Sequence, residues 1–185
     1  MINSFQKRIL AAANKIFIDK GYQNADMRSI AKEAGIAVGT IYNYYPNKAV
    51  LYQDILNEKW QDLSSSIIAI TEEPIEPIEK LSTITGLLFQ FIGQQLSIWN
   101  EIVEDPNRSE MCKDEGRRAS ELAHQQLNTY MCKVFTELGL TGDLMERHIL
   151  MYEAAVTYLG KYFSHEMEKN RQYIMLLMEK MMQTS

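Results

Sequence analysis

The sequence of 185 residues is poor in the residues that mark secreted and irregular folds. Its two cysteines, Cys112 and Cys132, are too few for a disulfide framework, and four prolines with nine glycines fit neither collagen nor a turn-rich β-sandwich. No segment alternates apolar and polar residues as a half-buried strand does. A composition of 46% hydrophobic and 23% charged residues is typical of a globular chain that buries its own core without cross-links.

Targeting and membrane signals are weak too. The first apolar run, residues 9–13, is short and is soon followed by Lys15 and Asp19, unlike the apolar part of a secretory signal. One uncharged run, residues 81–100, has the length of a membrane span, but its glutamines, serines and threonines favour a buried helix. We therefore expect a soluble, cytoplasmic protein with no membrane partner.

Motifs for metal or enzyme chemistry are missing from the sequence. His124, His148 and His165 stand far apart, and neither a His-x₃-His nor a Cys-x₂-Cys pair occurs. A Gly-rich phosphate loop and a Gly-x-Ser-x-Gly elbow are absent as well. The sequence thus predicts no metal, no cofactor and no enzyme. An enzyme whose catalytic residues converge from distant parts of a helical fold stays a distant alternative.

Charge is distributed unevenly along the chain, whose net charge is −5. Residues 1–60 hold eight basic and five acidic side chains, a balance of +3, which leaves −8 on residues 61–185. A basic head on an acidic body indicates that only the head meets a polyanion such as nucleic acid. Chance alone could produce a balance of this size, so the indication depends on the motif inside the head.

Helical periodicity covers most of the chain. Ile9, Ala13, Ile16 and Phe17 share one face of a first helix, which Gly21 is expected to end. Breaks at glycines and at the proline-containing segments 72–77 and 105–107 separate further predicted helices at about 27–34, 38–44, 48–70, 78–99, 119–138, 143–166 and 171–182. Gly116 is a candidate break ahead of the helix at 119–138. The expected fold is all-α, with about nine helices in two parts.

Residues 27–45 carry the motif that indicates a function. Two short helices, the first begun by Asp26 as N-cap, are joined through Gly35 and have the architecture of a helix-turn-helix. Ile41 would face the core, and Asn47 would cap the following long helix. The opposite face of the second short helix is left for solvent or DNA and carries Val38, Gly39, Thr40, Tyr42, Asn43 and Tyr44.

The sequence from Ile9 to about Leu56 resembles the N-terminal domain of TetR-family transcriptional regulators. The elements in common are FIDKGY at 17–22, IAKEAGI at 30–36 and GTIYNYYPNK at 39–48, in the same order and spacing. The resemblance implies a helix-turn-helix DNA-binding domain over residues 1–47. It further implies a helical ligand-binding and dimerisation domain over residues 48–185, with the helix from 48 to about 70 as connector.

The resemblance also implies roles for particular residues. Arg28 would touch the DNA backbone or a groove edge, and Thr40, Tyr42, Asn43 and Tyr44 would line the recognition helix. Tyr42 and Lys48 would clamp phosphates. Lys48 also stands at a helix N-terminus, where backbone N–H groups and the helix dipole favour an anion.

Three positions depart from the family pattern. Asp26 stands where the family often has Thr, so a phosphate-contacting hydroxyl is lost. Ala37 is a poor N-cap for the recognition helix. Tyr45 stands where Phe is common, and its hydroxyl must find a partner or reach solvent.

The body is rich in large, soft side chains, which in a member of this family implies an apolar ligand cavity among the middle helices. Candidate lining residues are Trp60, Leu63, Phe89, Trp99, His124, Tyr130 and Tyr152. For any one of them an ordinary place in the core is the simpler explanation. A ligand beside Trp60 and Leu63 would tilt the connector helix and change the spacing of two recognition helices.

The last two helices carry more apolar residues than one core stripe needs, from Leu144 to Tyr162 and from Tyr173 to Met181. Paired across a twofold axis, they would form a four-helix bundle. The predicted protein is a homodimer that binds a palindromic operator in double-stranded DNA, as a repressor released by a small apolar effector. The alternative is a ligand-independent helix-turn-helix dimer gated by a protein partner.

Overall fold

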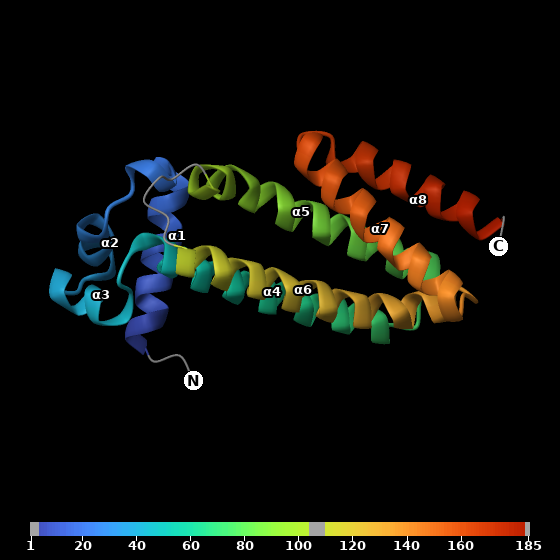
Figure 1. Cartoon of the computed structure of the whole chain (residues 1–185), viewed down its shortest axis with the longest axis horizontal. Helices are drawn as coiled ribbons and strands as arrows, with labels where there is room; N and C mark the ends of the chain where they lie inside the picture. Colours follow the sequence, from blue (N-terminus) through green and yellow to red (C-terminus); the bar gives the residue numbers. More distant parts are fainter. Residues whose placement is uncertain (1–3, 104–109, 184–185) are drawn as a thin grey trace. The chain divides into compact units, whose positions relative to one another are not determined.

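A computed structural model describes residues 4–103 and 110–183, and within these ranges it contains eight α-helices and no strand (Figure 1). The helices are α1 (Ser4–Asn24), α2 (Met27–Ala34), α3 (Val38–Tyr44), α4 (Lys48–Glu72), α5 (Pro77–Val103), α6 (Glu110–Glu137), α7 (Gly142–Tyr162) and α8 (Met167–Gln183). The all-α prediction is confirmed, with a helix count close to the one expected. None of the helices in these ranges is long and apolar enough to cross a membrane. The predicted turn at 105–107 lies outside the described residues.

The short helices α2 and α3 begin and end where the sequence predicts, and although Ala37 gives α3 no side-chain cap, such caps and one glycine define the ends of α2 and the start of α4. The Oδ1 atom of Asp26 accepts the backbone N–H of Ser29 at 2.9 Å, as an N-cap does. Gly35 takes the left-handed conformation, with φ 64° and ψ 41°, and its N–H returns to carbonyls of α2. Asn47 accepts two N–H groups of the first turn of α4, at 3.0 and 2.9 Å, and so caps that helix.

Two glycines in long helices differ in their effect. Gly21 has φ 76° and ψ 163°, so the helical path of α1 is broken there, as predicted. Gly116 lies inside α6, which continues through it, and the candidate break at this position is not present. A single glycine in a helix interior costs only about 1 kcal/mol, which tertiary packing of a long helix can offset. Pro77 is tolerated because it is the first residue of α5, where the missing N–H has no intrahelical partner to lose.

The chain folds into two compact units. Unit 1 comprises residues 1–60 and 97–120, and unit 2 comprises residues 61–96 and 121–185. The helices α4, α5 and α6 each begin in one unit and end in the other, so each unit contains part of all three. The predicted domain division between residues 47 and 48 stays a prediction.

The core of unit 1 is aromatic at its centre. The ring centroid of Phe17 lies 5.6 Å from those of both Tyr22 and Tyr52, and all three side chains are almost completely buried. Ile98 and Ile102, near the end of α5, belong to the same cluster. Each large apolar side chain buried in this way contributes roughly 1.5–3 kcal/mol. The helix-turn-helix is therefore supported by a packed core that includes a segment distant in sequence.

The core of unit 2 contains one buried hydrogen bond and one close approach of two helices. The Oγ1 atom of Thr85 on α5 and the hydroxyl of Tyr152 on α7 are 2.8 Å apart, and both side chains are fully buried. Gly160 on α7 allows Ile92 of α5 to come close, since a Cβ at Gly160 would lie 3.0 Å from its Cγ2 atom. At these two points α5 lies against α7.

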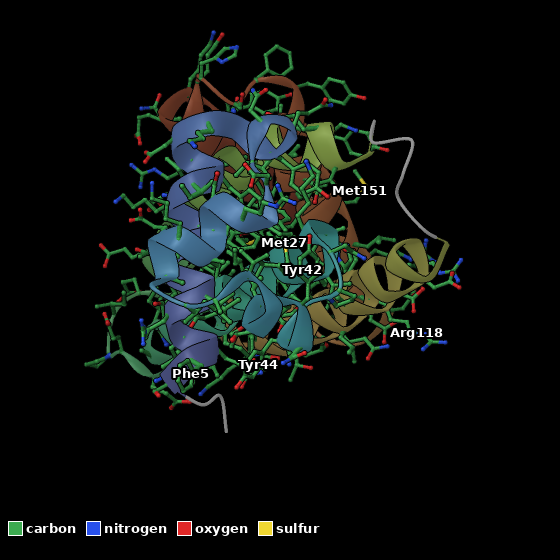
Figure 2. All side chains as sticks on the ribbon, turned by 90° about the vertical axis from the view of Figure 1, so that its left-hand side faces the viewer. Phe5, Met27, Tyr42, Tyr44, Arg118 and Met151 are labelled. Atoms are coloured by element: carbon green, nitrogen blue, oxygen red, sulfur yellow. The ribbon has the colours of Figure 1, made fainter. Side chains whose placement is uncertain are left out.

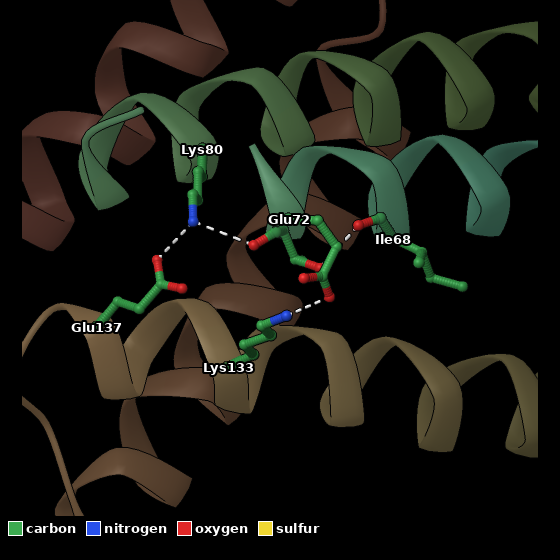
Figure 3. A network of polar contacts seen from close by, with 6 residues as sticks. Ile68, Glu72, Lys80, Lys133 and Glu137 are labelled. Atoms are coloured by element: carbon green, nitrogen blue, oxygen red, sulfur yellow. Dashed lines mark hydrogen bonds and ion pairs between the residues drawn. The ribbon is translucent and has the colours of Figure 1, made fainter. Parts of the chain in front are cut away.

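A polar network joins α4, α5 and α6 near the connection between the first two (Figure 3). The ammonium of Lys80 donates to the carbonyl of Thr71 at 3.0 Å and to Oε2 of Glu137 at 2.7 Å. The Lys80 side chain is 6% exposed. A buried cation is stable only with such partners, so both contacts are needed to compensate its desolvation. Lys133 and Glu72 form a second, exposed ion pair in the same network.

Candidate nucleic-acid interface

The first helix of the motif, α2, starts at a carboxylate where the family often has a hydroxyl. Asp26 accepts the hydroxyl of Ser29 at 2.7 Å as well as the Ser29 backbone N–H. These two hydrogen bonds lower the pKa of Asp26, and the bond from the Ser29 hydroxyl has the larger effect. A charged carboxylate stabilises the helix N-terminus and repels a phosphate at the same point. Arg28, which is exposed, is then the cation of this helix start.

Arg8 of α1 holds the turn between the two helices of the motif, a role that the sequence did not reveal. Its Nη2 atom donates to the carbonyl of Ala34 at 2.6 Å and to that of Gly35 at 3.2 Å. These are carbonyls at the end of α2 that have no intrahelical partner. Arg8 precedes the turn by 26 residues, so no local pattern could have indicated the contact.

The recognition helix α3 has one buried and one exposed face. Ile41 is completely buried and anchors the helix on the core of unit 1. Figure 2 looks onto the α2 and α3 end of unit 1 and labels Tyr42 and Tyr44. The exposed positions are Val38, Gly39, Tyr42 and Asn43, whereas Thr40 and Tyr44 are half-buried. Tyr44 packs against the core cluster, so only part of its ring faces outward.

Lys48, the predicted phosphate clamp, is engaged within unit 1. Its Nζ atom donates to the carbonyls of Tyr22, Gln23 and Ala25 at 2.8, 3.2 and 3.4 Å. It also lies 4.3 Å from the centroid of the Tyr22 ring, within range of a cation–π interaction. Its role as a phosphate contact stays a prediction, and the structure gives the residue a second role inside the unit.

Within residues 1–60, seven of the eight basic side chains fall into two groups, and the eighth, Lys59, is half-buried. Arg8, Lys48 and Lys15 bind groups of their own unit, the last through an ion pair with Glu33 at 2.6 Å. That ion pair raises the pKa of Lys15, mainly through the hydrogen bond to Glu33 and secondly through the negative charge of Glu33. The second group is exposed and consists of Lys7, Lys20, Arg28 and Lys32. This second group supplies the positive charge that is available to a polyanion.

The predicted pocket residues have different surroundings. Leu63, Phe89 and Tyr152 are buried, and the hydroxyl of Tyr152 is bonded to Thr85. Trp60 and Tyr130 are half-buried. The side chain of Trp99 lies outside the described residues.

His124 is the most exposed of the predicted pocket residues that the structure describes, with 57% of its side chain accessible. Its Nδ1 atom lies 3.6 Å from Oε2 of Glu153, and this contact raises the pKa of His124 against the opposing effect of desolvation. The structure therefore brings His124 of α6 next to Glu153 of α7, whereas the preceding residue, Tyr152, contacts Thr85 of α5.

In the last two helices, some of the residues predicted to form the dimer are buried and others are exposed. His148, Tyr152, Ile174 and Met178 are buried within the chain. Nine large apolar side chains between residues 144 and 176 are exposed, and these are Leu144, Leu150, Met151, Tyr158, Tyr162, Phe163, Met167, Tyr173 and Leu176. The rings of Tyr158 and Tyr162 stack with centroids 6.1 Å apart while more than 60% of each residue is accessible. We call this set the α7–α8 apolar surface.

Comparison with known proteins identifies relatives of the chain. Residues 9–55 match the profile of the family described as bacterial regulatory proteins, tetR family. The HTH-type transcriptional regulator UidR of Escherichia coli (strain K12) is 31% identical over 127 residues, which is 65% of this chain and 63% of UidR. The match therefore spans less than two thirds of that relative. The family and this relative are transcriptional regulators and not enzymes, in agreement with the sequence prediction.

Two solved structures share the fold over nearly the whole chain. A transcriptional regulator from Cytophaga hutchinsonii ATCC 33406 has a TM-score of 0.76 at 17% identity, covering 94% of this chain and 96% of that one. FadR of Thermus thermophilus, a TetR family transcriptional repressor in complex with lauroyl-CoA, has a TM-score of 0.60 at 22% identity, covering 91% and 92%. At these identities the likeness establishes the fold alone.

Proposed function

The chain belongs to the tetR family of bacterial regulatory proteins, and on this premise we propose that it is a homodimeric transcriptional repressor that a small apolar ligand releases from its operator. The observation that carries the proposal is the build of α3. Ile41 fixes one face of this helix on the core, while Val38, Gly39, Tyr42 and Asn43, which are short or flat, occupy the exposed face. A helix presented in this way fits the major groove of DNA.

The proposed DNA contacts divide by chemistry. Asn43 is suited to read a base edge, since an amide can pair with adenine through two hydrogen bonds. The hydroxyl of Tyr42 and the guanidinium of Arg28 would contact phosphates. Val38, Gly39, Thr40 and the outward part of Tyr44 would complete the surface that approaches the groove.

Selection of duplexes from a random pool with the purified chain tests the proposal. Enriched sequences should be palindromic, because a symmetric dimer reads two half-sites. Asn43→Ala should then lose about 1–3 kcal/mol of discrimination at one position in each half-site. Asn57→Ala, at an exposed position of α4, is the matched control and should bind DNA as the unaltered chain does. Failure of the pool to enrich any sequence would contradict the proposal.

The homodimer is supported by the α7–α8 apolar surface. A monomer would leave this aromatic and aliphatic set in water, at a cost that burial against a second copy removes. Sedimentation velocity at micromolar concentration should show a dimer. Tyr158→Glu should give monomers, whereas Leu122→Glu, a change at an exposed leucine of α6, should leave the dimer intact. A monomeric unaltered chain would contradict this part of the proposal.

The apolar effector is supported by the buried aromatic side chains of unit 2, Phe89, Phe135 and Tyr152, and by the acyl-CoA bound to the structurally similar FadR. Lauroyl-CoA and lauric acid are therefore the first compounds to titrate. If either is an effector, operator DNA must weaken its binding by the same factor by which it weakens DNA binding. Equal ligand affinity with and without operator would favour a ligand-independent dimer gated by a protein partner.

A further inference from the structure

The end of α1 is irregular and only partly capped by its own groups, since the amide of Asn24 donates to the carbonyl of Lys20 at 3.1 Å and the N–H of Ala25 donates to that of Tyr22 at 3.3 Å. The backbone leaves the helical conformation at Gly21, and the last turn of α1 contains no basic side chain of its own. Carbonyls in the last turn of a helix have no intrahelical partner and carry the negative end of the helix dipole. A cation supplied from elsewhere in the chain would therefore stabilise this end.

Lys48, the first residue of α4, supplies that cation. An ammonium carries three N–H donors, and three carbonyl oxygens, those of Tyr22, Gln23 and Ala25, lie 2.8 to 3.4 Å from its Nζ atom. The Tyr22 ring, which is 1% exposed, covers the same ammonium. The donor capacity of Lys48 is thus used within unit 1, in a geometry that converges on one segment.

The surroundings of Lys48 disfavour a phosphate as well. The amides of the first turn of α4 that would attract an anion are already bonded to Asn47. The carboxylate of Glu101 accepts the N–H of Gln23 at 2.8 Å and so places negative charge against the segment that Lys48 binds. A phosphate at Lys48 would have to compete with three carbonyls for the same ammonium.

We propose that Lys48 is a positioning residue of the DNA-binding head and not a phosphate contact. It ties the end of α1 to the start of α4, and only three residues separate the end of α3 at Tyr44 from Lys48. Because Tyr45 in this short connection is buried, the start of α4 sets where α3 lies on the core. Loss of these Lys48 contacts would misplace the recognition helix. The protein would then discriminate less well between base sequences, while the phosphate contacts remain. The proposal rests on the proposed DNA binding.

The test compares Lys48→Met, which keeps most of the aliphatic stem, with Arg28→Met, which removes a proposed phosphate contact. Each full-length variant is titrated, at several salt concentrations, with a random-sequence duplex and with the duplex enriched by selection on the unaltered chain. For Lys48→Met we expect unchanged random-duplex affinity, an unchanged salt slope, and an operator preference reduced on the order of tenfold. Arg28→Met should weaken both duplexes alike and flatten the salt slope by about one unit per half-site.

A Lys48→Met variant that weakens both duplexes equally and flattens the salt slope would overturn the proposal in favour of a phosphate clamp. An unchanged operator preference would overturn it too. Lys48→Arg is the second variant if Lys48→Met does not fold. A guanidinium binds phosphate well but cannot place three N–H groups on the three converging carbonyls, so we expect the same loss of operator preference. Operator preference unchanged in Lys48→Arg would contradict positioning, whereas failure of the unaltered chain to bind any duplex would contradict the proposed function itself.

Discussion

The hydroxyl of Tyr45, immediately after α3, donates a hydrogen bond to Oδ2 of Asp54 in the second turn of α4 at 3.1 Å. The Tyr45 side chain is buried, and burial, followed by the charge of Asp54, raises its pKa. Tyr45 stands where the family commonly has Phe, and Asp54 is the partner that its extra hydroxyl needs. This bond also joins the residue that follows the recognition helix to α4, in addition to the contact of Lys48 with the end of α1.

Tyr45→Phe should lower the free energy of unfolding by about 0.5–1.5 kcal/mol, the usual net contribution of such a bond. The measurement is chemical denaturation, with Asp54→Asn and the double variant completing a cycle. Tyr42→Phe, at an exposed ring of α3, is the control and should leave stability unchanged. Additive losses in the double variant would show that the bond does not contribute.

Gly39→Ala should change stability and operator affinity in opposite directions. A Cβ at Gly39 would meet nothing within 4 Å, and alanine favours a helix over glycine by about 1 kcal/mol, so the variant should be slightly more stable. The same methyl group would occupy space proposed for the approach of DNA, and operator affinity should fall. Gly86→Ala on α5, whose Cβ would lie at an ordinary 3.6 Å from Arg171, is the control for DNA binding. Undiminished operator affinity in Gly39→Ala would place this residue away from the interface.

Lys80→Met should destabilise the chain by roughly 2–4 kcal/mol, because it leaves a Glu137 carboxylate and a Thr71 carbonyl without their buried cation. Lys133→Met removes the exposed ion pair with Glu72 in the same network and should cost less than about 1 kcal/mol. Urea denaturation of the two variants measures both losses. Similar small losses in the two variants would mean that the burial of Lys80 is not energetically important.

The pair of His124 and Glu153 should make stability depend on pH. Contact with Glu153 raises the pKa of folded His124 above 6.5, so its stabilising effect is fully present below pH 6.5 and is lost as pH rises through the folded pKa. His124→Gln should therefore cost more stability at pH 5.5 than at pH 8, by less than about 1 kcal/mol because the ring is mostly exposed. Thermal unfolding at the two pH values measures the difference. A cost that is larger at pH 8 would contradict this assignment.

Local features of the fold were predictable from sequence because their causes are local. Asp26, Gly35 and Asn47 act within three residues of the helix ends that they define, and the bounds of α2 and the start of α4 follow from them. The apolar face of α1 and the burial of Ile41 follow from helical spacing in the same way.

Contacts between distant residues were not predictable by the same means. Arg8 reaches carbonyls 26 and 27 positions away, and Glu101 binds an N–H that precedes it by 78 positions. Such pairs leave no spacing pattern in a single sequence. The phosphate role predicted for Lys48 followed from the resemblance and from its place at a helix N-terminus, and neither indicates the contacts of its ammonium with the carbonyls at the end of α1.

The most direct test of the central claim is the symmetry and stoichiometry of DNA binding by the unaltered chain. The duplex enriched by selection is to be footprinted with hydroxyl radicals and its complex weighed by sedimentation. We predict a palindromic site whose half-site centres lie about 34–36 Å apart, or a multiple of a helical turn, with two chains for each pair of half-sites. A single, asymmetric footprint made by one chain, or no preference over random duplex, would contradict the account.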